Sequence, residues 1–256
     1  EICACLVGSE MCIRDRNGGE EMDTNNKKVY ELRVKVYILK DIPLREILAK
    51  EAEYIDSALA KNERWLEYHE TNRFKNYCFG GLYPIEKEGV YKKDNIYTVT
   101  VRTVDSNLAQ YFSKVLRNHY TDSMKGLTVE NRVLPRKVIG EIYSLTPVIQ
   151  KSDGGYWKNQ MSLEEFERRL FDNAVKKYNQ YTGKKIDEDF QLYTNITFLN
   201  RKPIANQYKG IQLLGDKVNL KIADNAQAQE LAYFLLGTGL CELNSRGYGY
   251  CNYRWL

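Results

Sequence analysis

Apolar and polar residues alternate along residues 29–39 (VYELRVKVYIL), a pattern that predicts a strand with one buried face. Residues 41–61 instead carry apolar residues at helical spacing, on a face made of Leu44, Ile47, Leu48, Ile55 and Leu59. Asp41 and Pro43 suit the beginning of this helix. The pattern therefore predicts a strand followed by a helix.

The same kinds of element continue along the next part of the chain. Two β-rich runs, a second helix and a further strand are predicted at 74–85, 95–104, 105–120 and 127–145. Asp105 stands where the cap of the second helix belongs. Strand, helix, strand, strand, helix, strand is the order of a ferredoxin-like (βαββαβ) unit.

This order then repeats. A strand, a helix, two β-rich runs, a helix and a last strand are predicted at 143–151, 162–181, 190–199, 210–223, 226–236 and 248–255. Ser162 and Glu165 form a capping box at the start of the long helix. We therefore expect an α+β protein with two tandem ferredoxin-like domains, at 29–143 and 144–256, and a C-terminal glycine-rich loop.

Residues 1–28 differ from the rest and are expected to be a disordered or artefactual segment. They lack a starting Met, a basic region and an apolar core long enough for a signal peptide. Their acidic residues outnumber their basic ones, so the remaining chain is more basic than the net charge of +4 suggests. The six cysteines match no zinc ligand spacing, and no apolar run is long enough to span a membrane. We expect a cytoplasmic protein with reduced thiols, no metal and no cofactor.

The stretch GTGLCELNSRGYG at 237–249 holds four glycines, which allow backbone N–H groups to approach an anion closely. Nucleotide-binding folds place such a loop between a strand and a following helix. Here the predicted helix precedes the loop and a strand follows it, which argues against a Rossmann or Walker site. A glycine cap followed by a tight turn is the structural alternative.

The overlapping stretch SRGYGYCNY at 245–253 fits the pattern K/R-G-F/Y-G/A-F-V-x-F/Y of RNA-recognition motifs, with Tyr250 for Phe and Cys251 for Val. In such a motif a helix and a fourth strand follow this segment, whereas only three residues follow here. We therefore expect a ferredoxin-like domain that ends on a glycine loop and a strand.

This combination resembles the CRISPR-associated repeat-processing endoribonucleases, the Cas6 family of the RAMP superfamily. The family signature G-x-G…N-S-x-G-[FY]-G is matched by 237–249, with Cys241 and Glu242 at its centre, and 144–149 and 171–185 resemble its second domain. The resemblance implies a metal-independent endoribonuclease that cleaves CRISPR precursor transcripts within the repeat, through attack by a ribose 2′-hydroxyl that leaves a 2′,3′-cyclic phosphate and a 5′-hydroxyl. Its implied partners are CRISPR repeat RNA and subunits of a CRISPR effector, and its implied state is a monomer or homodimer.

The resemblance also assigns residues. It places the catalytic histidine at His69 and the catalytic lysine at Lys75, six positions later, and Tyr54 is a third candidate on the first helix. His119 is expected to stabilise a helix C-terminus instead. Candidate RNA-binding residues are Gly237, Gly239, Ser245, Arg246, Gly247, Gly249, Arg73, Arg132, Arg136 and Lys137.

Each candidate has an ordinary structural alternative, and two other function classes stay open. The basic pairs at 168–169 and 176–177 are interpreted as an exposed helix face, which would suit phosphates if it faced the other domain. A non-catalytic RNA-binding RAMP subunit would share the fold without needing both His69 and Lys75. A single-stranded RNA chaperone would stack bases on the 20 tyrosines and would bind unrelated RNAs equally.

Overall fold

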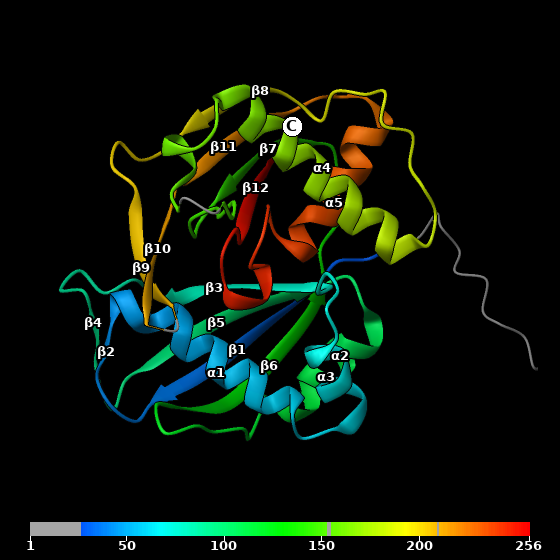
Figure 1. The fold of residues 1–256 in the computed structure, drawn as a ribbon. Helices are drawn as coiled ribbons and strands as arrows, with labels where there is room; N and C mark the ends of the chain where they lie inside the picture. Colours follow the sequence, from blue (N-terminus) through cyan, green and yellow to red (C-terminus); the bar gives the residue numbers. More distant parts are fainter. Residues whose placement is uncertain (1–26, 153–154, 209) are drawn as a thin grey trace, which may run out of the picture.

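The computed structural model describes residues 27–256 except 153, 154 and 209. Two four-stranded antiparallel sheets, each flanked by helices, form two ferredoxin-like domains that lie one above the other in Figure 1. The predicted fold class is therefore confirmed. The segment 1–26 lies outside the described residues, and of the predicted N-terminal segment only Lys27 and Lys28 are described.

The N-terminal sheet has the strand order β3-β5-β1-β6. Its strands are β1 (Tyr30–Ile38), β3 (Tyr77–Tyr83), β5 (Ile96–Thr103) and β6 (Met124–Val133), and its helices are α1 (Ile47–Leu59), α2 (Glu63–Glu70) and α3 (Ser106–Val115). A short strand, β2 (Ile42–Pro43), pairs with β4 (Val90–Tyr91). The 3₁₀ turn η1 (Leu44–Glu46) follows β2 along the chain and leads into α1. Alternate residues of β1 enter the core, as the period-2 pattern predicted.

The C-terminal sheet repeats this arrangement with the order β12-β7-β11-β8. Its strands are β7 (Ile139–Ser144), β8 (Tyr193–Phe198), β11 (Val218–Ile222) and β12 (Cys251–Trp255), and its helices are α4 (Leu163–Thr182) and α5 (Ala226–Thr238). A hairpin of β9 (Ile204–Tyr208) and β10 (Ile211–Gly215) is inserted between β8 and β11. Two further 3₁₀ turns are η2 (Trp157–Asn159) and η3 (Asn244–Arg246).

The helix caps lie where the sequence placed them. The Asp105 carboxylate accepts hydrogen bonds from the backbone N–H groups of Asn107 and Leu108 at the start of α3. The Ser162 hydroxyl accepts one from the N–H of Glu165 at the start of α4. These side chains satisfy donors that have no partner inside the helix, and so they fix the start of each helix.

The division between the two sheets differs from the prediction. The stretch 127–145 is two strands, β6 and β7, and β7 pairs with β11 and β12 of the C-terminal sheet. Pro135 lies between them and has no N–H to donate to a ladder, which accounts for the break. Residues 139–143, which we expected in the first domain, therefore belong to the second sheet, and the strand expected at 143–151 ends at Ser144.

The hydrophobic pattern misjudged two further parts of the chain. Residues 210–223 form β10 and β11 instead of one run, because the chain turns at Asp216, whose buried carboxylate accepts hydrogen bonds from Trp157 and Asn200. Helix α2 was not predicted at all, although Asn62 caps it by accepting a hydrogen bond from the N–H of Trp65. This helix matters because His69 lies in its last turn.

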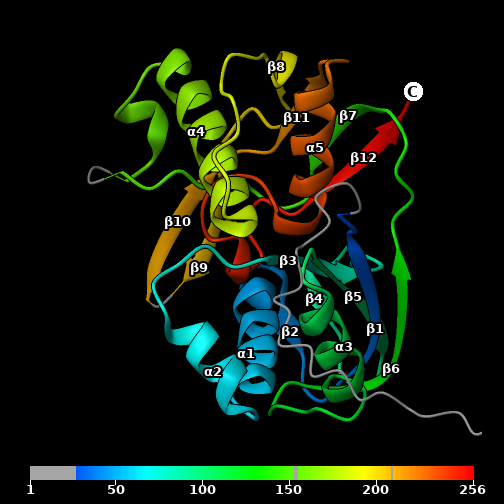
Figure 2. The same cartoon turned by 90° about the vertical axis from the view of Figure 1, so that its right-hand side faces the viewer.

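The stretch from Gly237 to Gly249, called the glycine loop below, connects α5 to β12 and packs against β3 and α1 of the other domain (Figures 1 and 2). A Cβ added at Gly247 would meet the Phe79 ring at 2.7 Å, so only glycine allows this approach. Tyr248 is buried inside the N-terminal core. The loop therefore fixes the position of the C-terminal domain on the N-terminal one.

Candidate active site

A solvent-open cavity of about 430 Å³, called the inter-domain cleft below, lies where the glycine loop, α4 and the connection from α2 to β3 meet. Two acidic residues line it, Asp172 and Glu242, against five cations, which are Arg73, Lys75, Lys151, Arg169 and Lys176. An excess of cations in a concave surface attracts polyanions and pairs with phosphates. The cleft therefore has the charge that a nucleic-acid backbone requires.

The near wall of the cleft is the connection from α2 to β3, residues 71–76. The backbone N–H of Phe74 donates to the Gln180 side-chain oxygen at 3.2 Å, and the Gln180 amide donates back to the Phe74 carbonyl at 3.1 Å. The Arg73 guanidinium lies over the Tyr68 ring, 4.6 Å from its centroid. Because Gln180 belongs to α4, these two hydrogen bonds hold the wall at a set distance from the helix across the cleft.

Lys75 is held at the end of this wall. Its Nζ donates to the carbonyls of Tyr68 at 2.6 Å and Thr71 at 2.7 Å, at the C-terminus of α2, where unpaired carbonyls attract a cation. An ammonium has three N–H groups, so one is left to point to a ligand. Partial burial, with the neighbouring charges of Arg73 and Arg246, lowers the pKa of Lys75 to about 8. Lys75 therefore combines a fixed position with an easily released proton.

His69 lies beside Lys75 but does not itself line the cavity. Its Nδ1 is 3.5 Å from Oδ1 of Asp56 on α1, and its side chain is 20% exposed. Burial lowers the pKa of His69 below 6.5, the charges of Arg246 and Lys75 act in the same direction, and Asp56 opposes them. The imidazole is therefore mainly neutral at pH 7 and able to accept a proton.

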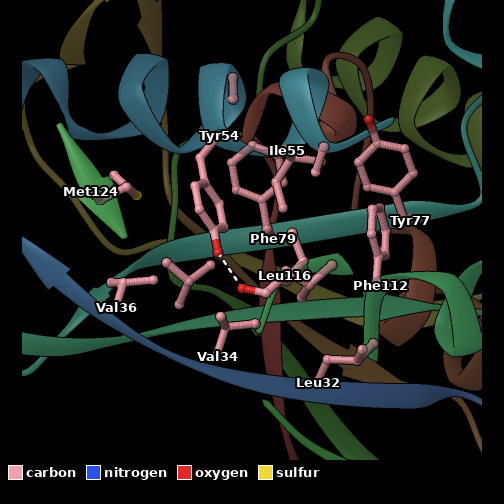
Figure 3. Close-up of a cluster of buried hydrophobic side chains, with 14 of the residues drawn as sticks. Leu32, Val34, Val36, Tyr54, Ile55, Tyr77, Phe79, Phe112, Leu116 and Met124 are labelled. Atoms are coloured by element: carbon pink, nitrogen blue, oxygen red, sulfur yellow. Dashed lines mark hydrogen bonds between the residues drawn. The ribbon is translucent and has the colours of Figure 1, made fainter. Parts of the chain in front are cut away.

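Tyr54 does not reach the cleft. It has no exposed surface, its hydroxyl donates to the Leu116 carbonyl at 2.7 Å, and its ring lies over the core beside Ile55 and Phe79 (Figure 3). Gly126 makes this position possible, because a Cβ there would collide with the Tyr54 hydroxyl. Burial raises the pKa of Tyr54. The expectation that Tyr54 is catalytic is therefore wrong for this structure, since its helix turns the phenol toward the sheet.

His119 also differs from its prediction. Helix α3 ends at Val115, so His119 is not in its last turn, and the imidazole is buried against Tyr54 with its Nε2 2.8 Å from the Ser57 hydroxyl. Burial lowers the pKa of His119 to about 4. It is therefore a neutral core residue instead of a cation that stabilises a helix end.

The glycines of the loop are buried and do not form an open nest of donors. The N–H groups of Gly239, Gly247 and Gly249 donate to the carbonyls of Leu235, Asn244 and Pro147. Gly237 belongs to α5, where a Cβ would meet Val104 at 2.7 Å. The expectation that these four glycines bind RNA is therefore wrong, because close packing and internal hydrogen bonds occupy them, and the structural alternative holds.

A buried lysine that the sequence pattern did not predict holds the glycine loop from below. Lys177 is 1% exposed, and its Nζ donates to the carbonyls of Gly239, at 3.0 Å, and Cys241. Burial lowers the pKa of Lys177 to about 8. Its neighbour Lys176 points the other way and lines the cleft. The basic pair at 176–177 is therefore one structural residue and one surface residue.

Other parts of the loop do face the cleft. Ser245 lines it, and the Asn244 amide donates to the carbonyls of Lys75 at 2.9 Å and Tyr77 at 2.7 Å. The Arg246 guanidinium is paired with the Asp56 carboxylate. The loop thus contacts α1, through Asp56, and the end of the wall that carries Lys75.

The basic residues near the end of β6 are not brought to the cleft. In Figure 2, β6 lies on the right of the molecule, whereas the connection from α2 to β3 lies on the left. Arg132 pairs with Glu31 at 2.6 Å, and Arg136 pairs with Glu230. Lys137 is exposed on the connection between the domains. The cleft is lined instead by Lys151, Arg169 and Lys176. The sequence pointed to Arg169 and Lys176, as parts of the basic pairs at 168–169 and 176–177, but not to Lys151.

Among the described residues there is neither a candidate metal-binding cluster nor a helix that could span a membrane. Within 27–256, apart from the three omitted positions, no three His, Cys, Asp or Glu side chains are grouped so that they could hold a metal ion. In the same residues no helix is both long and apolar enough to cross a membrane.

Comparison with known proteins shows similarity to Cas6 proteins. Residues 130–253 match the family model described as CRISPR associated protein Cas6, C-terminal. The chain is 24% identical to a CRISPR-associated endoribonuclease Cas6 of Methanocaldococcus jannaschii, over 76% of this chain and 87% of that protein.

Two solved structures share the fold. One, described as an RAMP protein binding different RNA substrates, has a TM-score of 0.65 at 15% identity and covers 88% of this chain and 99% of its own. The other, from a Cas6-related gene of Pyrococcus furiosus, has a TM-score of 0.61 at 18% identity and covers 88% and 98%. Residues 130–253 therefore carry a Cas6 C-terminal domain, and the chain as a whole is similar to a Cas6 endoribonuclease and shares its fold with solved structures of Cas6 and RAMP proteins.

Proposed function

We propose that this protein is an endoribonuclease that cleaves CRISPR precursor transcripts within the repeat and so produces guide RNAs. The observation that carries the proposal is the pairing of a neutral imidazole, His69, with a cation of lowered pKa, Lys75, beside a cleft rich in positive charge. The Cas6 relative is named as an endoribonuclease, and the RAMP structure is described as binding RNA. CRISPR repeat RNA is accordingly the proposed substrate.

In the proposed reaction, cations of the cleft bind the RNA backbone so that a ribose 2′-oxygen lies in line with the adjacent phosphorus and its 5′-oxygen. His69 accepts the proton of the 2′-hydroxyl as the 2′-oxygen attacks phosphorus. Lys75 stabilises the negative charge that grows on the phosphorane and supplies a proton to the departing 5′-oxygen. The P–O5′ bond breaks, and the products are a 2′,3′-cyclic phosphate and a 5′-hydroxyl.

Every proton in this reaction is moved by a side chain, so the proposal requires no metal ion. The test uses the full chain with a repeat RNA under single-turnover conditions, with and without EDTA. We expect equal rates and products that end in a cyclic phosphate and a 5′-hydroxyl. A strict need for Mg²⁺, or a 5′-phosphate product, contradicts the mechanism. Binding of the repeat without any cleavage supports a non-catalytic RNA-binding subunit instead.

A further inference from the structure

Asp56 lies between two residues of the candidate site. Its Oδ1 is 3.5 Å from Nδ1 of His69, and its Oδ2 is paired with the Arg246 guanidinium of the glycine loop. Oδ1 of Asp56 and Nδ1 of His69 are both buried, and neither has a hydrogen-bond partner among the described residues. Two buried polar atoms that face each other at this distance complement each other, and catalytic hydrogen bonds are often long before the substrate binds.

A carboxylate at Nδ1 has a defined effect on an imidazole. It favours the tautomer that carries its proton on Nδ1, leaves the Nε2 lone pair free to accept a proton, and stabilises the imidazolium that then forms. A cation on the other carboxylate oxygen fixes the plane of the carboxylate.

We propose that Asp56 is the positioning residue of His69, and that Arg246 holds Asp56 in the orientation in which Nε2 of His69 faces the RNA 2′-hydroxyl. This inference rests on the proposed endoribonuclease function. It also gives Arg246 a role other than the phosphate contact expected from the sequence, since its guanidinium is committed to Asp56.

The charged groups around His69 come from three elements and from the connection after α2. Asp56 on α1 and Glu70 on α2 favour the imidazolium, whereas Arg246 on η3 and Lys75 after α2 disfavour it. Asp56 and Arg246 therefore act on His69 in opposite directions. Neutralising either residue should therefore shift the His69 titration, and only loss of the Asp56 carboxylate should also lower the Nδ1–H population of His69.

The chain has two histidines, so His69 can be followed by NMR in the whole chain without RNA. We expect Asp56→Asn to lower the pKa of His69 and to reduce its Nδ1–H population, and Arg246→Gln to raise that pKa. Glu53→Gln is the matched control, because Glu53 is one turn away on α1, is exposed and pairs with Lys50. It should leave the His69 titration unchanged.

The second readout is cleavage with a repeat RNA. Asp56→Asn should slow single-turnover cleavage by about 10- to 100-fold with affinity within a few fold, as expected when a residue that orients a proton-transfer group is changed. Asp56→Glu keeps the negative charge, so it should recover part of the cleavage rate and bring the pKa of His69 back toward the parental value. If Asp56→Asn does not fold, Asp56→Glu replaces it as the test variant.

The outcomes separate the two proposals. If His69 titrates identically in the parent, Asp56→Asn and Arg246→Gln, the positioning role is overturned, whatever the cleavage rates are. If the His69 titration shifts as expected but the parent protein does not cleave repeat RNA, the contact stands and the proposed function fails. If the parent and His69→Ala cleave at the same rate, the contact stands and the role of His69 as base fails. If all titrations shift and both variants slow cleavage, the inference and the function on which it rests are supported.

Discussion

Arg102 of β5 donates a hydrogen bond of 2.7 Å to the backbone carbonyl of Cys251 in β12, which joins the two sheets. The same guanidinium is paired at 2.8 Å with Glu31 of β1, and both side chains are almost fully buried. These ion pairs lower the pKa of Glu31 although burial alone would raise it. A buried carboxylate is tolerated here because Arg102 and Arg132 compensate it.

We predict that Arg102→Met lowers the free energy of unfolding by about 3–5 kcal/mol, because it leaves Glu31 buried without its main partner. Urea denaturation followed by circular dichroism measures the loss. The matched control is Arg132→Met, which removes a pair whose cation is 46% exposed and should cost about 0–1 kcal/mol. Equal losses in the two variants would show that burial does not set the strength of these pairs.

Replacing the proposed base should reduce the rate of cleavage and leave binding intact. His69→Ala is expected to slow single-turnover cleavage by about 10²- to 10⁴-fold, because proton transfer contributes to the transition state and little to ground-state binding. Affinity is measured separately on an RNA that lacks the 2′-hydroxyl at the cut site. A parental cleavage rate in a folded His69→Ala protein rules out its role as base.

The pH dependence of cleavage should be bell-shaped. The rate rises as His69 loses its proton, at a pH below 6.5, and falls as Lys75 loses its proton near pH 8. Lys75→Arg should slow the reaction and move the alkaline limb to much higher pH, because a guanidinium stays charged. An alkaline limb that persists near pH 8 in Lys75→Arg would assign it to another group.

Cations of the cleft should contribute to the salt dependence of RNA binding. Lys176→Ala is expected to reduce the slope of log K against log salt concentration by about 0.7–0.9, the value for one phosphate contact, and to weaken binding. Lys137→Ala is the control, since Lys137 is equally exposed but lies away from the cleft. If Lys137→Ala changes the slope and Lys176→Ala does not, the RNA follows the other side of the molecule.

Acidification should destabilise the protein through His119. The pKa of the folded-state imidazole is lowered to about 4 by burial, with Lys61 acting in the same direction, so the unfolded chain binds more protons between pH 4 and 6.5. Stability therefore rises with pH across this window and is lost as the pH falls. His119→Gln should flatten the dependence of Tm on pH there, and unchanged steepness would point to other groups. Its cleavage rate at pH 7 should match the parent.

The overall fold could be predicted because its signals are local. Alternation along β1 and the caps Asp105 and Ser162 each depend on a few neighbouring residues. The break at Pro135 and the turn at Asp216 were missed because they depend on the sheet that each strand joins. Strand β7 joins β11 and β12, which lie far away along the chain, so its place is a long-range property.

The candidate site could be predicted only in part. The family spacing placed His69 and Lys75 on neighbouring elements, and the structure keeps them together. Spacing along α1 did not reveal that the Tyr54 phenol turns into the core, where Gly126 leaves room for it. The sequence also could not separate Lys176 from Lys177, because only tertiary packing places one in the cleft and the other under the glycine loop.

Tyr248 belongs to the glycine loop but fills the core of the N-terminal domain. A ribosome makes this residue long after it has made β1, α1 and β3, so the first domain cannot complete its packing while the chain is still growing. Its apolar surface around Phe79 and Leu48 stays partly uncovered until the loop arrives. The two ferredoxin-like units are thus separate in topology but share one packed surface, and we expect them to unfold in a single transition.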